Sequence, residues 1–163
     1  MLLLSSFRAP ILSFRPAFVR LSAMSKPGLT RLARRKGFQC MHSYAVKDWS
    51  VEQNREVFGA CFTPHGHGHN YELEAYFEGP IDPVTGMIVN LSLVDQWLAE
   101  VIQPLDGKHL NHEVPEFLGK VPTTEALAQF LCVKLQAKPQ GEGLKLFKLR
   151  LYEYEDLWVD VWP

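Results

Sequence analysis

The stretch HGHNYELEAYFE, residues 67–78, alternates between two kinds of side chain. One set of alternate positions holds His67 and His69, followed by Tyr71 and then by Leu, Ala and Phe. The other set is largely polar and includes Asn70 and three glutamates. A period of two is typical of a β-strand that is buried on one face. The sequence therefore predicts a strand over residues 67–78 that carries two histidines on its buried face.

The patterns on either side predict the other elements. Residues 32–44 resemble a first strand, and residues 45–66 show no sustained period and are expected to form a long loop. A turn at 82–86 precedes a helix from about residue 91, capped by Asn90, and Thr123 or Thr124 caps a second helix. After the glycine-rich break at 141–143, two alternating segments follow, and the first places Phe147, Leu149, Leu151 and Glu153 on one face. The order ββααββ predicts an α+β domain: an antiparallel four-stranded sheet with two helices on one face.

Composition limits the classes of function. The chain has 163 residues, 47% of them hydrophobic and 21% charged, which fits one globular domain. The formal net charge of -1 gives no reason to expect nucleic-acid binding by the chain as a whole. No apolar run is long enough to predict a membrane span. Three cysteines without close pairing argue against a disulfide framework and favour a reducing, cytoplasmic location.

Residues 1–30 differ from the remainder of the chain. They contain arginines, serines and apolar residues but no acidic residue. Three interpretations stay open: a transit peptide that directs the protein to mitochondria, a poorly ordered basic tail, or an incorrectly assigned start upstream of Met24. We expect the folded domain to span residues 31–163.

Three histidines alternate with glycines at positions 65, 67 and 69. On a strand, residues two apart point to the same side, so His67 and His69 can bind one ion. His42 on the neighbouring strand is the natural third ligand. Three protein ligands and an open position are typical of a catalytic zinc site. The pair His65 and His67 has the same spacing, but the strand pattern continues from 67 and 69, so we expect His65 in the loop.

Other residues are candidates for chemistry or binding. Cys61 lies just before the histidines, and a nearby zinc ion and imidazoles would favour its thiolate as base or nucleophile. Cys40 and Cys132 are expected in the core. Asp106, His109 and His112 follow the first helix and could form a proton relay or be ordinary loop residues. Glu153 ends an apolar strand face, where it would bind a guanidine-like ring edge or lie in solvent.

These motifs resemble the pyruvoyl-tetrahydropterin synthase and carboxy-tetrahydropterin synthase family over roughly residues 34–162. The similar segments are Phe38–His42, Cys61–Tyr71, Gly86–Leu91, Leu105–Asp106, Leu110–Asn111, Pro122–Glu125 and Tyr152–Glu153. Their order along the chain matches the family, and the combination is specific.

The resemblance implies a tunnelling fold, in which sheets of several subunits form a barrel, and a homo-hexamer built as a dimer of trimers. It implies a zinc-dependent carbon–oxygen lyase that converts 7,8-dihydroneopterin triphosphate to 6-pyruvoyl-tetrahydropterin with loss of triphosphate. The implied zinc ligands are His42, His67 and His69, and the implied base is Cys61. The implied pterin-binding residues are Thr123, Thr124, Glu125 and Glu153.

The chain departs from the family in the relay loop, where Asp106 is followed by Gly107 instead of histidine. His109 is the candidate replacement. Two alternatives to the pyruvoyl product stay open. One is the 6-carboxy-5,6,7,8-tetrahydropterin synthase of queuosine biosynthesis or a side-chain-cleaving aldolase activity, since Cys61 and His65 have a spacing found in carboxy-forming enzymes. The other is a non-catalytic relative that binds zinc and pterin.

Overall fold

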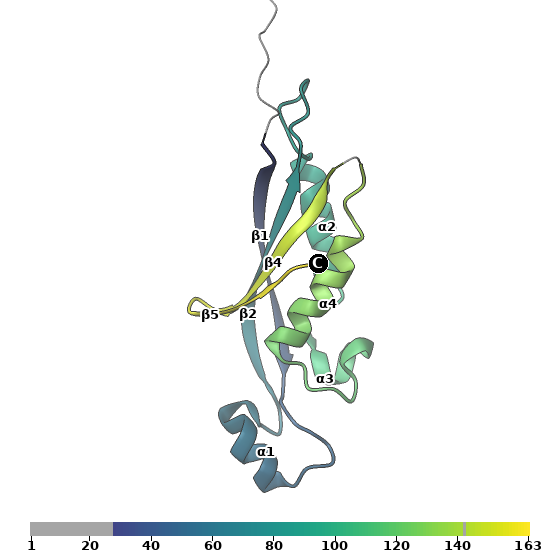
Figure 1. Cartoon of the computed structure of the whole chain (residues 1–163). Coiled ribbons are helices and arrows are strands. Elements are labelled where there is room, and N and C mark those ends of the chain that lie inside the picture. Colours follow the sequence, from purple (N-terminus) through teal and green to yellow (C-terminus); the bar gives the residue numbers. More distant parts are fainter. Residues whose placement is uncertain (1–27, 142) are drawn as a thin grey trace, which may run out of the picture.

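A computed structural model describes residues 28–141 and 143–163 of the chain (Figure 1). The expectation of a basic N-terminal extension falls almost wholly on residues 1–27, which lie outside the described residues. The first strand begins at Thr30, one residue before the expected domain boundary. No helix in the described ranges is long and apolar enough to cross a membrane.

The sheet has five strands in the order β3-β1-β2-β4-β5. Their bounds are β1 Thr30–His42, β2 His67–Gly79, β3 Lys108–His109, β4 Lys145–Tyr154 and β5 Leu157–Val161. The four long strands pair antiparallel, as expected, but the short β3 runs parallel to β1. The prediction of a four-stranded antiparallel sheet is therefore wrong in one respect: a short fifth strand pairs parallel at the edge, so the sheet is mixed. Two residues are too few for any periodicity to reveal them.

Helices α2 (Leu91–Ile102) and α4 (Thr124–Gln136) cover one face of the sheet (Figure 1). Both helices begin at the predicted capping residues. The Asn90 side chain accepts a hydrogen bond from the Ser92 N–H at 2.9 Å, and the Thr123 side chain accepts one from the Ala126 N–H at 3.2 Å. Their apolar sides meet the buried side of β2 and β4, where Leu73, Ala75, Phe77, Leu149 and Leu151 are fully buried. The core thus lies between one sheet face and two helices, as the α+β prediction requires.

Two further helices, α1 (Val51–Phe58) and α3 (Leu110–Glu113), were not predicted, and 3-10 turns cover Gly59–Cys61 and Pro115–Phe117. Helix α1 starts with a capping box, in which Ser50 and Gln53 exchange side-chain and backbone hydrogen bonds. Asn54 is its buried residue and ties the helix to the preceding loop. Because capping and an amide, rather than an apolar stripe, hold α1 in place, a search for hydrophobic periodicity misses it.

The register of β1 against β2 aligns the two strands that carry the histidines. Thirteen pairs run from Thr30↔Gly79 to His42↔His67. The pairs Phe38↔Tyr71 and Cys40↔His69 therefore share the buried face with His42. This confirms the alternation predicted for residues 67–78 and brings the third histidine beside the other two.

Strand β4 contains a bulge that changes one sequence expectation. The pairing with β2 steps from Tyr76↔Lys148 to Phe77↔Leu146, which leaves Phe147 as the extra residue. Leu146 is buried in place of Phe147, and Phe147 instead packs under the guanidinium of Arg31, 3.5 Å from its ring centroid. The expectation that Phe147 shares the face of Leu149 is therefore wrong.

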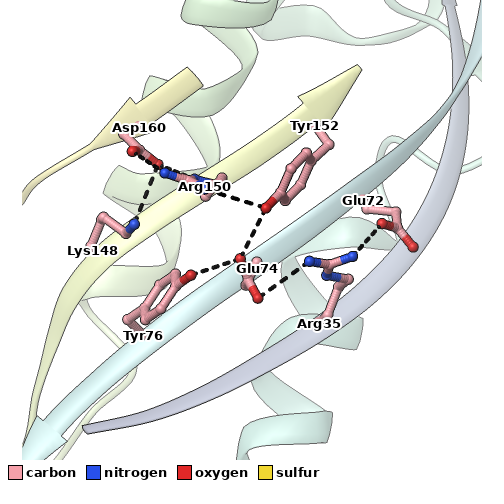
Figure 2. Close-up of polar contacts among 8 residues, drawn as sticks. All are labelled: Arg35, Glu72, Glu74, Tyr76, Lys148, Arg150, Tyr152 and Asp160. Atoms are coloured by element: carbon pink, nitrogen blue, oxygen red, sulfur yellow. Dashed lines mark hydrogen bonds and ion pairs between the residues drawn. The ribbon is translucent and has the colours of Figure 1, made fainter. Parts of the chain in front are cut away.

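The other face of the sheet is polar, and Figure 2 shows its ladder of charges and phenols. The Tyr76 hydroxyl donates to Glu74 at 2.8 Å, and Arg35 contacts the same carboxylate at 3.5 Å. Further along, Arg150 donates to both carboxylate oxygens of Asp160 at 2.6 Å. The two faces of the sheet thus differ. The helix-covered face forms the core and carries the histidines at one end, whereas the other face carries charged and phenolic side chains.

Candidate metal centre and active site

His42, His67 and His69 converge at the end of β1 and the start of β2. Each offers a ring nitrogen, and these atoms lie within 4.8 Å of one another. The Nε2 atoms of His42 and His67 are 3.1 Å apart. Ligands of a tetrahedral zinc ion at about 2.0–2.1 Å would be separated by roughly 3.3 Å, so the spacing of His42 and His67 already suits one, with the third nitrogen within 4.8 Å. His65 is exposed and outside this group, which favours the register with 67 and 69.

The hydrogen bonds of His42 fix which of its nitrogens is free. Its Nδ1 lies 3.1 Å from the Pro122 carbonyl oxygen, which can only accept. The proton therefore belongs on Nδ1, and the lone pair of Nε2 faces the other two histidines. Burial, followed by the neighbouring His67 and His69, lowers the pKa of His42 to about 4. Its imidazole is neutral near pH 7, which is the form that binds metal ions.

The remaining histidines also fit a metal ion. Burial and the adjacent His67 lower the pKa of His69. The buried Nε2 of His69 has no hydrogen-bond partner, although the Glu153 carboxylate approaches it at 3.3 Å without hydrogen-bond geometry. A buried polar atom without a partner is costly in a folded protein unless something binds it. A divalent cation at the centre of the three nitrogens would supply that partner.

Glu153 lies on β4, beside the histidine cluster. The antiparallel register pairs Glu72 with Tyr152, so Tyr71 and Glu153 follow as neighbours on the buried face. Glu153 is 7% exposed and accepts a hydrogen bond from the Thr124 hydroxyl at the first turn of α4. Burial raises the pKa of the Glu153 carboxyl, the Tyr71 hydroxyl lowers it by a hydrogen bond, and nearby Glu125 raises it. The expected solvent-exposed alternative for Glu153 is therefore wrong.

The other expected pterin-binding residues lie at the start of α4. Thr123 caps the helix with its side chain, Thr124 is buried against Glu153, and Glu125 is exposed. The hydroxyl of Thr123 thus already has a structural role. A cavity of about 880 Å³ is lined by His69 and Glu153 and extends to Arg35, and Thr123, Thr124 and Glu125 do not line it.

Cys61 lies at the end of the 3-10 turn after α1, on the same side of the domain as the histidines. Its backbone carbonyl accepts from the Tyr44 N–H at 3.0 Å, and the Tyr44 ring lies 4.8 Å from the His42 ring. Burial, then the charge of Glu153, raises the pKa of the Cys61 thiol. His42 and His69, whose pKa values are lowered, supply no positive charge near pH 7, so a bound cation would be needed to favour the thiolate. Cys40 and Cys132 are buried, as expected for core residues.

The candidate relay residues do not come together within this chain. The Asp106 carboxylate is exposed and accepts from the Gln39 N–H at 2.9 Å, at the edge of β1. His109 turns the other way and lies over Gly66, where an added Cβ would be 2.6 Å from its Nε2. Its ring packs against His112 with centroids 4.3 Å apart. No hydrogen bond joins the side chains of Asp106 and His109 among the described residues.

Several residues of the site were not singled out by sequence reasoning. The Tyr71 hydroxyl lies 3.2 Å from Nδ1 of His42, and Asn111 clamps the backbone of Ser43 with two hydrogen bonds of 2.9 Å. Tyr71 follows His69 by two positions, so the period-two pattern already placed it on the histidine face. Asn111 and Pro122 belong to segments that resemble the family, but no pattern assigned them a role, because tertiary contacts bring them to β1.

Together, the fold and the site define a class: an α+β domain with three histidines at the end of its sheet that could hold a metal ion, next to a buried carboxylate and an open cavity. Residues 31–163 match the family model described as 6-pyruvoyl tetrahydropterin synthase. The chain belongs to this family.

Relatives and solved structures agree with this assignment. The 6-pyruvoyl tetrahydrobiopterin synthase of Pongo abelii is 41% identical over 127 residues, covering 77% of this chain and 86% of the relative. That of Poecilia reticulata is 44% identical over 126 residues, with 77% and 82% covered. The structure of Caenorhabditis elegans 6-pyruvoyl tetrahydropterin synthase aligns with a TM-score of 0.78 at 26% identity, over 86% of this chain and 99% of that one. A putative 6-carboxy-5,6,7,8-tetrahydropterin synthase of Archaeoglobus fulgidus is more distant, 25% identical over 95 residues.

Proposed function

We propose that the protein is a zinc-dependent carbon–oxygen lyase that converts 7,8-dihydroneopterin triphosphate to 6-pyruvoyl-tetrahydropterin with release of triphosphate. The observation that carries the proposal is the match to 6-pyruvoyl tetrahydrobiopterin synthases at about 40% identity over most of both chains, together with the histidine triad of the site. The more distant archaeal match makes the carboxy-forming activity the second candidate.

His42, His67 and His69 are the proposed ligands of a zinc ion. Three imidazoles that converge on one point suit zinc, which commonly takes nitrogen ligands in tetrahedral sites. A bound zinc would act as a Lewis acid on oxygens of the substrate side chain and make the adjacent C–H bonds more acidic. The chain itself holds the ligands in place through the strand register and the His42–Pro122 hydrogen bond.

Glu153 is the proposed anchor of the pterin ring. A pterin presents adjacent N–H donors on its pyrimidine edge, and one carboxylate can accept both, as it accepts a guanidinium. Burial of Glu153 excludes water from that pair and strengthens it. Thr124 holds the carboxylate in position, while Thr123 and Glu125 flank Thr124 at the start of α4.

Cys61 is the proposed base. It would remove and return a proton at the substrate side chain, and Asp106 and His109 would pass protons onward. Tyr44 supports a shared site, since its N–H donates to the Cys61 carbonyl at 3.0 Å and its ring lies 4.8 Å from the His42 ring. The position after Asp106 has no titratable side chain, because it is Gly107. His109 is proposed to replace the missing imidazole, since its ring lies near the His42 backbone.

The oligomer is proposed to be a homo-hexamer, a dimer of trimers located in the cytoplasm, with residues 31–163 as the assembling domain. Two features support an assembly. Strand β1 pairs with β3 only at Cys40 and Met41, so much of its outer edge is available to another strand, and β5 ends the sheet on the other side. In addition, Arg35 is the cation that lines the cavity within the described part of the chain, and it already bonds Glu72 and Glu74. A triphosphate requires further cations, which a neighbouring subunit would supply.

The test is to incubate the zinc-loaded protein with 7,8-dihydroneopterin triphosphate and identify the products by mass, with Cys61→Ala as control. A pyruvoyl product that is lost in the variant supports the proposal. A carboxy product would replace it with the second candidate. Stoichiometric zinc without any product would identify a non-catalytic relative that binds metal and pterin.

A further inference from the structure

The long connection between β1 and β2 returns to the point where β1 ends. Strand β1 ends at His42 and β2 begins at His67, so the connection leads away from one histidine and back to the next. Cys61 lies near its end, and residues 62–66 that follow are in neither a helix nor a strand. Contacts outside regular structure must therefore fix the position of Cys61 relative to the histidines.

Ser43, the residue after His42, supplies one of these contacts. Its hydroxyl donates a hydrogen bond to the Thr63 carbonyl oxygen at 2.7 Å. The backbone of Ser43 is fixed separately, because the Asn111 side chain bonds both its N–H and its carbonyl oxygen at 2.9 Å. Ser43 thus has a fixed backbone and directs its hydroxyl at a residue two positions after Cys61.

The Thr63 carbonyl oxygen is also joined to the start of β2. It accepts a hydrogen bond from the N–H of Gly66 at 3.4 Å, and Gly66 directly precedes His67. Gly66 in turn packs against the backbone of His42, since an added Cβ would lie 2.7 Å from its carbonyl oxygen. The hydrogen bond of Ser43 therefore closes a ring of contacts that includes the strand ends of both His42 and His67.

Tyr44, the next residue, attaches the other side of the same segment. Its N–H donates to the Cys61 carbonyl oxygen at 3.0 Å. Its ring contacts His42 and Phe58, with centroids 4.8 Å and 5.8 Å apart, and Phe58 is the last residue of α1. The two residues after His42 thus hold the segment before and after Cys61.

We propose that Ser43 is a positioning residue: its hydroxyl holds the Cys61 segment against the strand ends that carry the metal ligands, and so sets the distance between the base and the ion. This inference rests on the proposed function, which assigns those roles to Cys61 and the histidines. The effect of a cation on a thiol falls with the distance between them, so a displaced Cys61 gains less thiolate from the same ion. The same hydrogen bond steadies the backbone beside His42 and His67, so zinc binding depends on it as well.

The experiment compares the full-length protein with Ser43→Ala, which removes the hydroxyl, and with Ser43→Thr, which keeps it. Zinc affinity is measured by competition with a chromophoric chelator. Alkylation of Cys61 by iodoacetamide is followed near pH 7 with and without zinc, because the thiolate is the reactive form. Mass spectrometry of the peptides separates Cys61 from the buried Cys40 and Cys132. The reagent is uncharged, so the ion neither attracts nor repels it.

The matched control is Ser50→Ala, in the same connection. The Ser50 hydroxyl caps α1 by accepting from the Gln53 N–H at 3.1 Å. In the unmodified protein we expect zinc to speed the alkylation of Cys61 about tenfold. In Ser43→Ala this factor should fall to about threefold, and zinc affinity should fall about tenfold. Ser43→Thr and Ser50→Ala should keep both values.

An unchanged alkylation factor in Ser43→Ala would overturn the inference, whatever the zinc affinity. Equal losses in Ser43→Ala and Ser50→Ala would overturn it, because they would reflect a loosening of the whole connection, and so would an equal loss in Ser43→Thr. Slower alkylation of the unmodified protein with zinc would also overturn it, because Cys61 would then be a ligand of the ion. Failure of the proposed function looks different: the unmodified protein would release no triphosphate from 7,8-dihydroneopterin triphosphate, while zinc affinity and alkylation still depend on Ser43.

Discussion

Replacing Gly66 by alanine should damage the metal centre through the backbone. Gly66 has φ +74°, and an added Cβ would lie 2.6 Å from Nε2 of His109 and 2.7 Å from the backbone oxygen of His42. The left-handed conformation costs an L-residue about 1–2 kcal/mol. The contacts are closer than Cβ atoms tolerate, so the strand end that carries His42 must move, at a further cost of about 1–3 kcal/mol.

The matched control is Gly86→Ala. Gly86 has nearly the same φ, +72°, but an added Cβ meets nothing within 4 Å. We expect urea unfolding of the control to show the strain alone, about 1–2 kcal/mol, with unchanged zinc affinity. For Gly66→Ala we expect roughly 2–5 kcal/mol and zinc binding at least about tenfold weaker, since His42 is displaced. Equal unfolding energies and equal zinc affinities in the two variants would refute this reasoning.

Three further predictions concern pH, the candidate relay and the loop before α1. Because the folded pKa of His42 is lowered to about 4, below its usual 6.5, its contribution to stability is complete above pH 6.5 and is lost as pH falls from 6.5 to 4. We therefore expect the free energy of unfolding of the metal-free protein, measured in urea with a chelator present, to fall between pH 6.5 and 4 by up to about 1.4 kcal/mol per pH unit more than that of His42→Gln. Glu153 is present in both proteins and so does not cause the difference. Identical slopes of unfolding free energy against pH would contradict this prediction. His109→Ala should lower kcat more than His112→Ala, and equal, mild effects would remove His109 from the relay. Asn54→Ala should cost about 2–3 kcal/mol of unfolding free energy, because Asn54 is 4% exposed and bonds both backbone groups of Val46; a loss below about 0.5 kcal/mol would show that α1 does not depend on this amide.

The alternation of residues 67–78 was sufficient to predict β2, its buried face and two histidines on that face. The reason is local: successive side chains of a strand point to opposite sides whatever the rest of the protein does. The caps at Asn90 and Thr123 were predictable for a similar reason, since a helix start needs an acceptor for its first N–H groups. The family resemblance extended these local predictions to an enzyme class, and the comparisons confirmed it.

Features that depend on contacts between distant segments were missed or left open. Strand β3, the bulge at Phe147 and helix α1 show no hydrophobic periodicity. Strand β3 pairs with the edge of β1, Phe147 packs against Arg31, and α1 is joined to the preceding loop by Asn54. The same applies to the relay: sequence proximity suggested that Asp106 and His109 act together, but the loop bonds to β1 at Gln39 and points the two side chains in different directions.

The sequence by itself therefore determined the strand that carries His67 and His69, the two capped helices and the family, because these depend on local geometry and residue order. Only the tertiary structure decided which atoms meet. The register of β1 against β2 brings His42 to the other histidines, and the pairing of β2 with β4 sets Tyr71 beside Glu153. Such pairings are chosen by burial of the whole sheet face, since a slip of one residue would turn every side chain of the strand to the opposite side.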